Sequence, residues 1–359
     1  MKRVLLAILL ILIPLPTATA ASNQIILTDK PYREYDGKFL KNNLEADLAP
    51  AGRLGQKVFA PLNRPRVWVI DPALIEDILQ YQVDQDSIVA LNWLNQLKRE
   101  SARDSVFATA YANPDVKLAN RISPSELKFY YIFGQGLLSK ELGRPVYSAE
   151  IGGWNLGRSN LTNDNFYDYQ TARRALRNLV TVIPAIEVEA DRAKLARMLT
   201  LGLTRSERDT LVANYLAGNQ KTINKLRVVG GKYRLTTDKE KLPITLVNDF
   251  ENPVTVKLEF EPLNARIKFP KFEAVELKPK SRVQIPVQVT NIAAGESTVI
   301  ARFVNEKEEQ VGGEADLNIV SSVISPLVAW FTTGAAILLL LAAVVQSVRR
   351  IRRSRNEKP

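Results

Sequence analysis

Residues 66–75 are Arg-Val-Trp-Val-Ile-Asp-Pro-Ala-Leu-Ile, and they determine the fold class expected for the first half of the chain. The apolar run at 67–70 predicts a strand that is buried on both faces, as strands of parallel sheets are. Asp71 is a favourable N-cap and Pro72 suits the first turn of a helix, so we expect a helix to begin directly after the strand. The stretch therefore predicts a strand-to-helix unit of the α/β kind.

Strands and helices are expected to alternate downstream of this unit. Helices are predicted at 73–81, 87–101 and 123–142, and strands at 105–110 and 145–149; Ser123 and Glu126 are predicted to form a capping box. Further helices are predicted at 169–179, 190–201 and 206–216, with one more strand at 180–183. This order predicts a barrel-like α/β module at 66–227. A closed eightfold barrel has roughly 250 residues, so an incomplete barrel stays open as an alternative.

From residue 228 the apolar period changes to two. Alternating apolar and polar residues occupy six segments separated by turn-forming residues, at 233–236, 243–248, 254–260, 283–289, 297–303 and 315–320. Short strands at close spacing predict an all-β immunoglobulin-like sandwich at 228–320. The chain has no cysteine, so the sandwich is expected to lack an inter-sheet disulfide.

The N-terminal part of the chain is expected to contain an export signal and an extension. Lys2 and Arg3 precede an apolar stretch at 4–13 and small residues at 18–20, which predicts a cleaved signal peptide at 1–20. In the extension at 21–65 we expect a short strand at 25–27. A helix at 44–59 is predicted to be broken near Pro50 and Gly52.

The C-terminal part of the chain predicts a membrane anchor. Residues 319–348 carry no charged side chain, and a transmembrane helix is expected at 323–348. The basic tail at 349–359 contains five arginines and one lysine. Such a cluster remains on the cytoplasmic side and attracts anionic lipids. We therefore expect a single-pass protein of the cell membrane with its ectodomain outside.

Composition excludes several classes of function. Eight of the 49 Lys and Arg and one of the 38 acidic residues lie in the predicted signal peptide and tail, which leaves 41 basic and 37 acidic residues between them. This near balance does not predict a nucleic-acid partner. The chain has no histidine and no cysteine, which excludes Ser-His-Asp and Cys-His catalysis and the usual zinc sites. No metal and no cofactor are expected.

Several stretches resemble a known protein family. They are 70–74, 111–115, 150–157, 243–248, the turn Asn252-Pro253-Val254, and the Arg-Arg-Ile-Arg-Arg stop at 349–353. On these residues the chain is similar to an uncharacterised actinobacterial family of signal-peptide-bearing, single-pass membrane-anchored envelope proteins. This domain of unknown function is often encoded near the peptidoglycan-precursor flippase. The family pattern has Asp where this chain has Asn113, and Trp-Pro where it has Ser148-Ala149. The resemblance therefore implies a location and an architecture, and no reaction.

Three carboxylates follow apolar strands of the predicted α/β module, namely Asp71, Asp115 and Glu150. Ligands bind at the carboxyl ends of parallel strands, so these acids are the catalytic candidates and are also candidates for binding sugar hydroxyls. The alternative is that Asp71 and Asp115, each beside a proline, cap helices or turns.

Trp154 is the candidate ligand-binding residue. It lies in a polar, glycine-containing loop, where its ring is placed to stack on a sugar or a base. The alternative is that Trp154 is a packed aromatic residue of the loop and does not contact a ligand.

These features predict a non-enzymatic, membrane-anchored cell-envelope protein. It is expected to bind a wall glycan or a membrane protein of cell-wall precursor export, with membrane lipid around its anchor. One alternative is a carboxylate-dependent glycoside hydrolase that acts on an envelope glycan. Another is a structural scaffold for a transporter or flippase complex.

Overall fold

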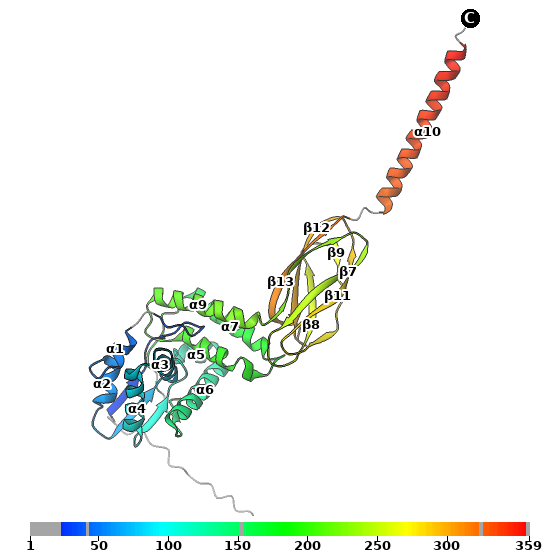
Figure 1. The fold of residues 1–359 in the computed structure, drawn as a ribbon. Helices are drawn as coiled ribbons and strands as arrows, with labels where there is room; N and C mark the ends of the chain where they lie inside the picture. The colour runs from blue at the N-terminus through cyan, green and yellow to red at the C-terminus, as the bar shows by residue number, and fades with distance from the viewer. Residues whose placement is uncertain (1–22, 41–42, 151–153, 155, 323–325, 357–359) are drawn as a thin grey trace, which may run out of the picture. The chain divides into compact units, whose positions relative to one another are not determined.

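The computed structural model describes residues 23–40, 43–150, 154, 156–322 and 326–356. Two compact units are present, one built from Met1–Gln170 with Ala190–Gly218 and the other from Thr171–Glu189 with Asn219–Pro359. Figure 1 shows helices around a small sheet in the first unit and long strands in the second. The predicted signal peptide at 1–20 lies outside the described residues.

The first unit contains a parallel sheet with its strands in chain order, β1-β2-β3-β4. They are β1 (Asn23–Leu27), β2 (Arg66–Ile70), β3 (Ser105–Ala108) and β4 (Tyr147–Ser148). Strand β2 is buried on both faces, since Trp68, Val69 and Ile70 all have no exposed surface. The α/β class predicted from this apolar run is confirmed.

Helices connect each strand to the next. They are α1 (Leu44–Leu48) and α2 (Arg53–Phe59) before β2, α3 (Pro72–Gln85) and α4 (Ile88–Ser101) before β3, and α5 (Val116–Ile122) and α6 (Pro124–Leu142) before β4. Leu44, Leu54 and Trp93 from three of these helices share one core with Trp68 of the sheet. The Trp93 indole donates a hydrogen bond to the Leu54 carbonyl at 3.0 Å, so its buried N–H is satisfied.

The strands that the structure describes in the first unit do not form a closed barrel, so only the incomplete form of the barrel-like module stays as a prediction. The sheet is open, because β1 and β4 are its two edges and β4 has only two residues. The strand expected at 180–183 is a turn. After β4 the first unit and its continuation are helical: α7 (Asn163–Leu179), η1 (Ala185–Glu187), α8 (Glu189–Lys194), η2 (Leu195–Leu199) and α9 (Arg205–Ile223). Among its described residues, the first unit therefore has no further strand with which to close a barrel.

The second unit contains the β-strands expected after residue 228. They are β5 (Leu226–Val228), β6 (Gly231–Leu235), β7 (Lys239–Asn248), β8 (Val254–Pro262), β9 (Ile267–Lys268), β10 (Ala274–Leu277), β11 (Ser281–Asn291), β12 (Gly295–Val304) and β13 (Gln310–Ser321). Strand β7 pairs with β11, and β8 pairs with β12, which pairs with β13. Strand β5 pairs antiparallel with β7, whereas β6 pairs parallel with β13.

The nine strands form one curled mixed sheet in the order β10-β8-β12-β13-β5-β7-β11-β9, with β6 paired to β13, and its strands enclose one core as in immunoglobulin-like domains. Leu246 of β7 and Val287 of β11 are fully buried, as are Ala301 of β12 and Leu317 of β13. The predicted immunoglobulin-like character of the second half is thus confirmed. The polar faces of these strands alternate with the buried positions, as the period of two predicts.

The last helix, α10, spans Pro326–Asn356. Its apolar side chains at 338–341 are exposed. Within the part of the chain that the structure describes, no helix has the length and hydropathy needed to cross a membrane. The transmembrane helix expected at 323–348 therefore stays a prediction, and its first residues, 323–325, lie outside the described part.

Candidate functional site

The loop after β3 is bonded to a segment from much later in the chain, residues 195–200. The Asp115 amide donates to the Leu199 carbonyl at 2.9 Å, and the Thr200 hydroxyl donates to the Ala112 carbonyl at 2.8 Å. Pro114 and Thr200 also form an isolated β-bridge. Segment 195–200 therefore packs against the loop that follows the carboxyl end of β3.

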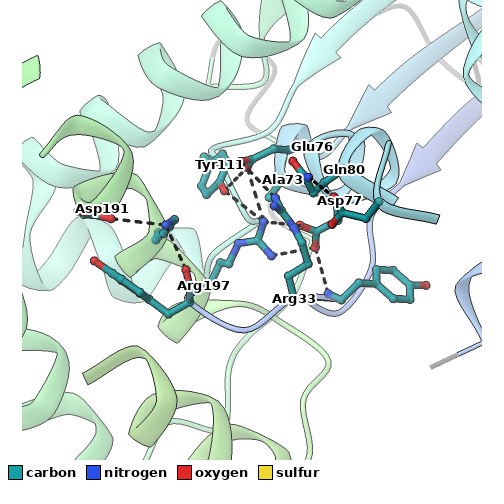
Figure 2. Close-up of polar contacts among 12 residues, drawn as sticks. Arg33, Ala73, Glu76, Asp77, Gln80, Tyr111, Asp191 and Arg197 are labelled. Carbon is teal, nitrogen blue, oxygen red and sulfur yellow. Dashed lines mark hydrogen bonds and ion pairs between the residues drawn. The ribbon is translucent and has the colours of Figure 1, made fainter. Parts of the chain in front are cut away.

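The regions that follow β1 and β2 are held to the same segment by Asp77. Figure 2 shows the guanidinium groups of Arg197 and Arg33 converging on this carboxylate. Arg197 donates to both Asp77 oxygens at 2.7 and 2.8 Å, and Arg33 Nε donates at 2.7 Å. Arg33 follows β1 and Asp77 lies in α3, after β2. Residues that follow the carboxyl ends of β1, β2 and β3 are thus linked to segment 195–200, those after β1 through Asp77.

Asp77 and Arg197 form a fully buried ion pair. Their exposed fractions are 1% and 2%. Burial alone would raise the pKa of Asp77, but the guanidinium groups of Arg197 and Arg33 lower it below its ordinary value. The same carboxylate holds the pKa of Arg197 well above its ordinary value despite the burial of that group. Each of these buried charges is therefore compensated mainly by the other, with Arg33 as a second partner of Asp77 at 2.7 Å and Glu76 as a second partner of Arg197 at 3.6 Å.

Asp71 is a buried helix cap, as the alternative interpretation of this residue expects. Its Oδ1 accepts hydrogen bonds from the Ala73 amide at 2.9 Å and the Ala112 amide at 3.0 Å. Ala112 and Asn113 have positive φ angles of 64° and 41°. Such angles are unfavourable for alanine, so Asp71 stabilises a strained turn after β3. Burial raises the pKa of Asp71 to about 7.

Asp71→Asn is expected to change the dependence of stability on pH. Because the folded-state pKa is raised from 3.8 to about 7, the native protein binds the extra proton between these values, and stability falls as pH rises through this window. Asparagine keeps the acceptor oxygen and has no charge. The stability of Asp71→Asn relative to wild type should therefore increase by about 2–3 kcal/mol from pH 5 to pH 8. Urea unfolding at both pH values measures this; equal slopes for the two proteins would contradict it.

Asp115 and Glu150 do not join Asp71 in one cleft. Asp115 caps α5 through the Leu118 amide at 3.0 Å, and its other oxygen accepts from the Ser159 amide at 2.8 Å. Asp71 lines a hollow of about 10 Å³, whereas Asp115 lines a separate hollow of about 500 Å³. Glu150 is exposed, and its amide donates to the Ser148 hydroxyl at 3.2 Å. The structure thus brings the loops of Asp71 and Asp115 under segment 195–200 and leaves Glu150 apart.

Trp154 lies against the sheet. Its ring centroid is 5.9 Å from that of Phe107 in β3, and its indole nitrogen is buried with no hydrogen-bond partner among the residues the structure describes. The contact with Phe107 is the packed-loop arrangement that the sequence left open as an alternative. Stacking of Trp154 on a ligand stays a prediction.

The capping box predicted at Ser123 and Glu126 is wrong. The Ser123 side chain makes no capping hydrogen bond to α6, and its hydroxyl lies 3.3 Å from the Tyr169 hydroxyl. Glu126 instead accepts hydrogen bonds from Arg192 at 2.7 and 3.0 Å. Both side chains are buried, so tertiary contacts replace the local ones.

A cleft of about 630 Å³ opens beside the Asp77 network. Its ionisable lining residues other than tyrosine are four cations, Arg33, Lys38, Lys194 and Arg197, and four carboxylates, Glu34, Asp36, Glu76 and Asp84. The four positive and four negative charges balance, so the cleft offers many hydrogen-bond donors and acceptors and has no net charge. Tyr35, Tyr111 and Tyr215 complete the wall.

The sequence interpretation missed the central residue of this site, Asp77. A usable signal was present, because Asp77 lies three residues after Leu74 and next to Ile78, on the helix face that these two apolar residues define. A carboxylate at such a position requires a buried cation. Nothing local indicated that the cation would be Arg197, which lies 120 positions later.

The sequence of the chain also matches a known protein family. The model of a family of unknown function (DUF6049) matches residues 154–356. The chain belongs to this family. The matched region covers the immunoglobulin-like strands and α10, and it begins after β4. No curated protein matches the chain.

Solved structures resemble parts of this DUF6049 protein. One is the Caenorhabditis elegans MSP family member WR4, with 11% identity, a TM-score of 0.21, and coverage of 28% of this chain and 99% of that one. Another is a FixG-related protein from Vibrio parahaemolyticus, with 10% identity, a TM-score of 0.20, and coverage of 23% and 79%. A third is Salmonella alpha-2-macroglobulin, with 16% identity, a TM-score of 0.22, and coverage of 27% and 7%. Similarity this low carries no argument about function.

Proposed function

We propose that this protein is a non-enzymatic component of the cell envelope whose first unit binds an uncharged, hydroxyl-rich glycan in the cleft beside Asp77. The observation that carries the proposal is the occupation of the strand ends by segment 195–200. In α/β folds, ligands are usually bound and transformed at the carboxyl ends of the parallel strands. Here the protein's own Arg197, Leu199 and Thr200 are bonded to it.

The same observation disfavours glycoside hydrolysis. A retaining glycosidase requires two carboxyl groups about 5 Å apart, and an inverting one requires roughly 6.5–9.5 Å with space for water and substrate between them. Asp71 and Asp115 accept backbone hydrogen bonds, are buried, and line different hollows. Neither carboxylate is placed to reach a substrate in a shared site.

The chemistry of the cleft supports a glycan as the ligand. Its balanced charges give no electrostatic preference for an anion or a cation. Carboxylate and ammonium groups such as those of Glu34 and Lys38 can accept from and donate to sugar hydroxyls. Neither side chain has a polar partner in the described part of the chain, so both are available to a ligand.

Location at a membrane is part of the proposal and is supported by the sequence. The uncharged stretch at 319–348 is followed by the arginine cluster at 349–355, and helix α10 spans Pro326–Asn356. The described residues alone do not meet the criterion for a spanning helix. Leu327 and Val328 add apolar residues whose side chains lie outside the described part. Protease treatment of intact cells should remove the ectodomain and spare a tag on Pro359; loss of that tag would contradict this topology.

The glycan proposal is tested with the double variant Glu34→Ala/Lys38→Ala. It removes one charge of each sign from the cleft, so the net charge is unchanged. Affinity for an arabinogalactan-type polymer should fall about tenfold or more, as expected for the loss of hydrogen bonds to charged groups. The matched control is Lys271→Ala/Glu273→Ala on exposed positions of the second unit, which should bind as wild type does. Equal affinity of all three proteins, measured by calorimetry, would contradict the proposal.

A further inference from the structure

A second hollow of the first unit differs from the cleft in the sign of its charge. It has a volume of about 500 Å³, and its lining side chains include three cations, Lys117, Arg121 and Arg158. All three are exposed, and none has a hydrogen bond or ion pair with another residue that the structure describes. The hollow thus presents three positive charges that the described protein does not neutralise.

The single carboxylate of the hollow is already bound. Asp115 is 4% exposed, and its two oxygens accept hydrogen bonds from the amides of Leu118 and Ser159. The Ser159 hydroxyl also lies 3.3 Å from the Asp115 Oδ2. Asp115 further interacts electrostatically with the buried guanidinium of Arg208. It is therefore not free to pair with the three exposed cations.

Polar and apolar groups complete the walls of this hollow. Thr162 and Asn163 provide a hydroxyl and an amide, and Leu118, Leu161 and Phe166 provide apolar surface. The geometry points to a site for a phosphoryl group carried on an organic body such as a sugar. A phosphoryl group has a charge of about −1.5 to −2 at neutral pH, and arginine binds its oxygens in a bidentate manner. The apolar walls would contact the carbon skeleton.

This inference is independent of the proposed glycan site, because the hollow and the cleft share no lining residue. Loss of the cleft by Glu34→Ala/Lys38→Ala should leave the hollow intact. Conversely, failure of phosphate binding would not affect the test of the cleft. The two proposals can therefore fail separately.

The test measures binding of glucose 1-phosphate, inorganic phosphate and glucose to the full-length protein by calorimetry. Glucose 1-phosphate should bind saturably to wild type, and Arg121→Gln and Arg158→Gln should each weaken it about fivefold or more. Combining the two substitutions should weaken binding further. Because the cations are exposed, the affinity should also fall as salt concentration rises. Inorganic phosphate reports whether the phosphoryl group is sufficient or the sugar is needed.

The matched control is Lys98→Gln, which removes an exposed cation of α4 outside the hollow. It should bind glucose 1-phosphate as wild type does, and glucose should not compete for the hollow. Absence of saturable binding of both phosphate compounds would overturn the inference. So would an equal loss of affinity in Lys98→Gln, or binding of glucose that is as tight as that of glucose 1-phosphate and is weakened equally by Arg121→Gln and Arg158→Gln.

Discussion

Asp77→Asn is expected to lower the free energy of unfolding by about 3–5 kcal/mol, the usual effect of removing one partner of a buried ion pair. Arg197 would then remain 2% exposed without the Asp77 charge, and one of its two hydrogen bonds would be lost, because the asparagine NH2 group donates and cannot accept. Arg33 would lose the same partner. Urea unfolding followed by tryptophan fluorescence reports on this unit, because Trp68, Trp93 and Trp154 all belong to it.

The control for this prediction is Asp84→Asn, which changes an exposed acid of the same helix. Asp84 accepts one hydrogen bond, from Gln80 at 2.6 Å, and its loss should change stability by less than about 1 kcal/mol. The double variant Asp77→Leu/Arg197→Met should lose less stability than the sum of the two single substitutions. Both charges of the pair are removed together, so neither is left buried without its partner. If Asp77→Asn were no more destabilising than Asp84→Asn, the buried pair would not stabilise the site.

Gly218→Ala is expected to destabilise the protein by about 1–3 kcal/mol and to abolish glycan binding in the cleft. A Cβ atom at this position of α9 would meet Tyr35 Cγ and Cδ1 at 2.1 and 2.0 Å. These atoms are close to the backbone, so a simple rotation of the ring does not relieve the overlap. Tyr35 is also fixed by Asn214, which accepts from its amide at 2.8 Å, and by Lys194, which donates to its carbonyl at 3.1 Å.

The cleft should be lost with the Tyr35 contact because residues 33–38 line it. Gly136→Ala in α6 is the matched control, since no atom lies within 4 Å of a Cβ there. That variant should gain up to about 1 kcal/mol from helix propensity and bind glycan normally. Urea unfolding and calorimetry on both variants provide the comparison. A gain in stability for Gly218→Ala, with binding retained, would show that Tyr35 does not depend on close packing against α9.

Local chemistry explains the parts of the fold that were predictable. The run at 67–70 forms a buried strand and Asp71 with Pro72 begins α3, as residues of these types do in most contexts. The helix expected to break near Pro50 and Gly52 is indeed two helices, α1 and α2. At Gly52 a Cβ would lie 2.1 Å from the Ala46 carbonyl oxygen, so glycine permits the tight turn.

The site was less predictable because its contacts join distant positions. Asp71 and Asp115 follow strands as expected, but their partners are backbone amides of loops whose course depends on segment 195–200. Arg197 lies in a short 3-10 helix with no amphipathic period that would assign it to the first unit. Only its pairing with Asp77 across 120 positions defines the site, and a single sequence does not reveal such a pairing.

The measurement that tests the central claim most directly follows binding and bond cleavage in one mixture. Wild-type protein is incubated with an arabinogalactan-type polymer, and both bound protein and newly formed reducing ends are measured. We predict saturable binding with no reducing ends above a protein-free control. Turnover by the wild type that Asp71→Asn and Glu150→Gln both abolish would show that the protein is a glycoside hydrolase and would contradict this account.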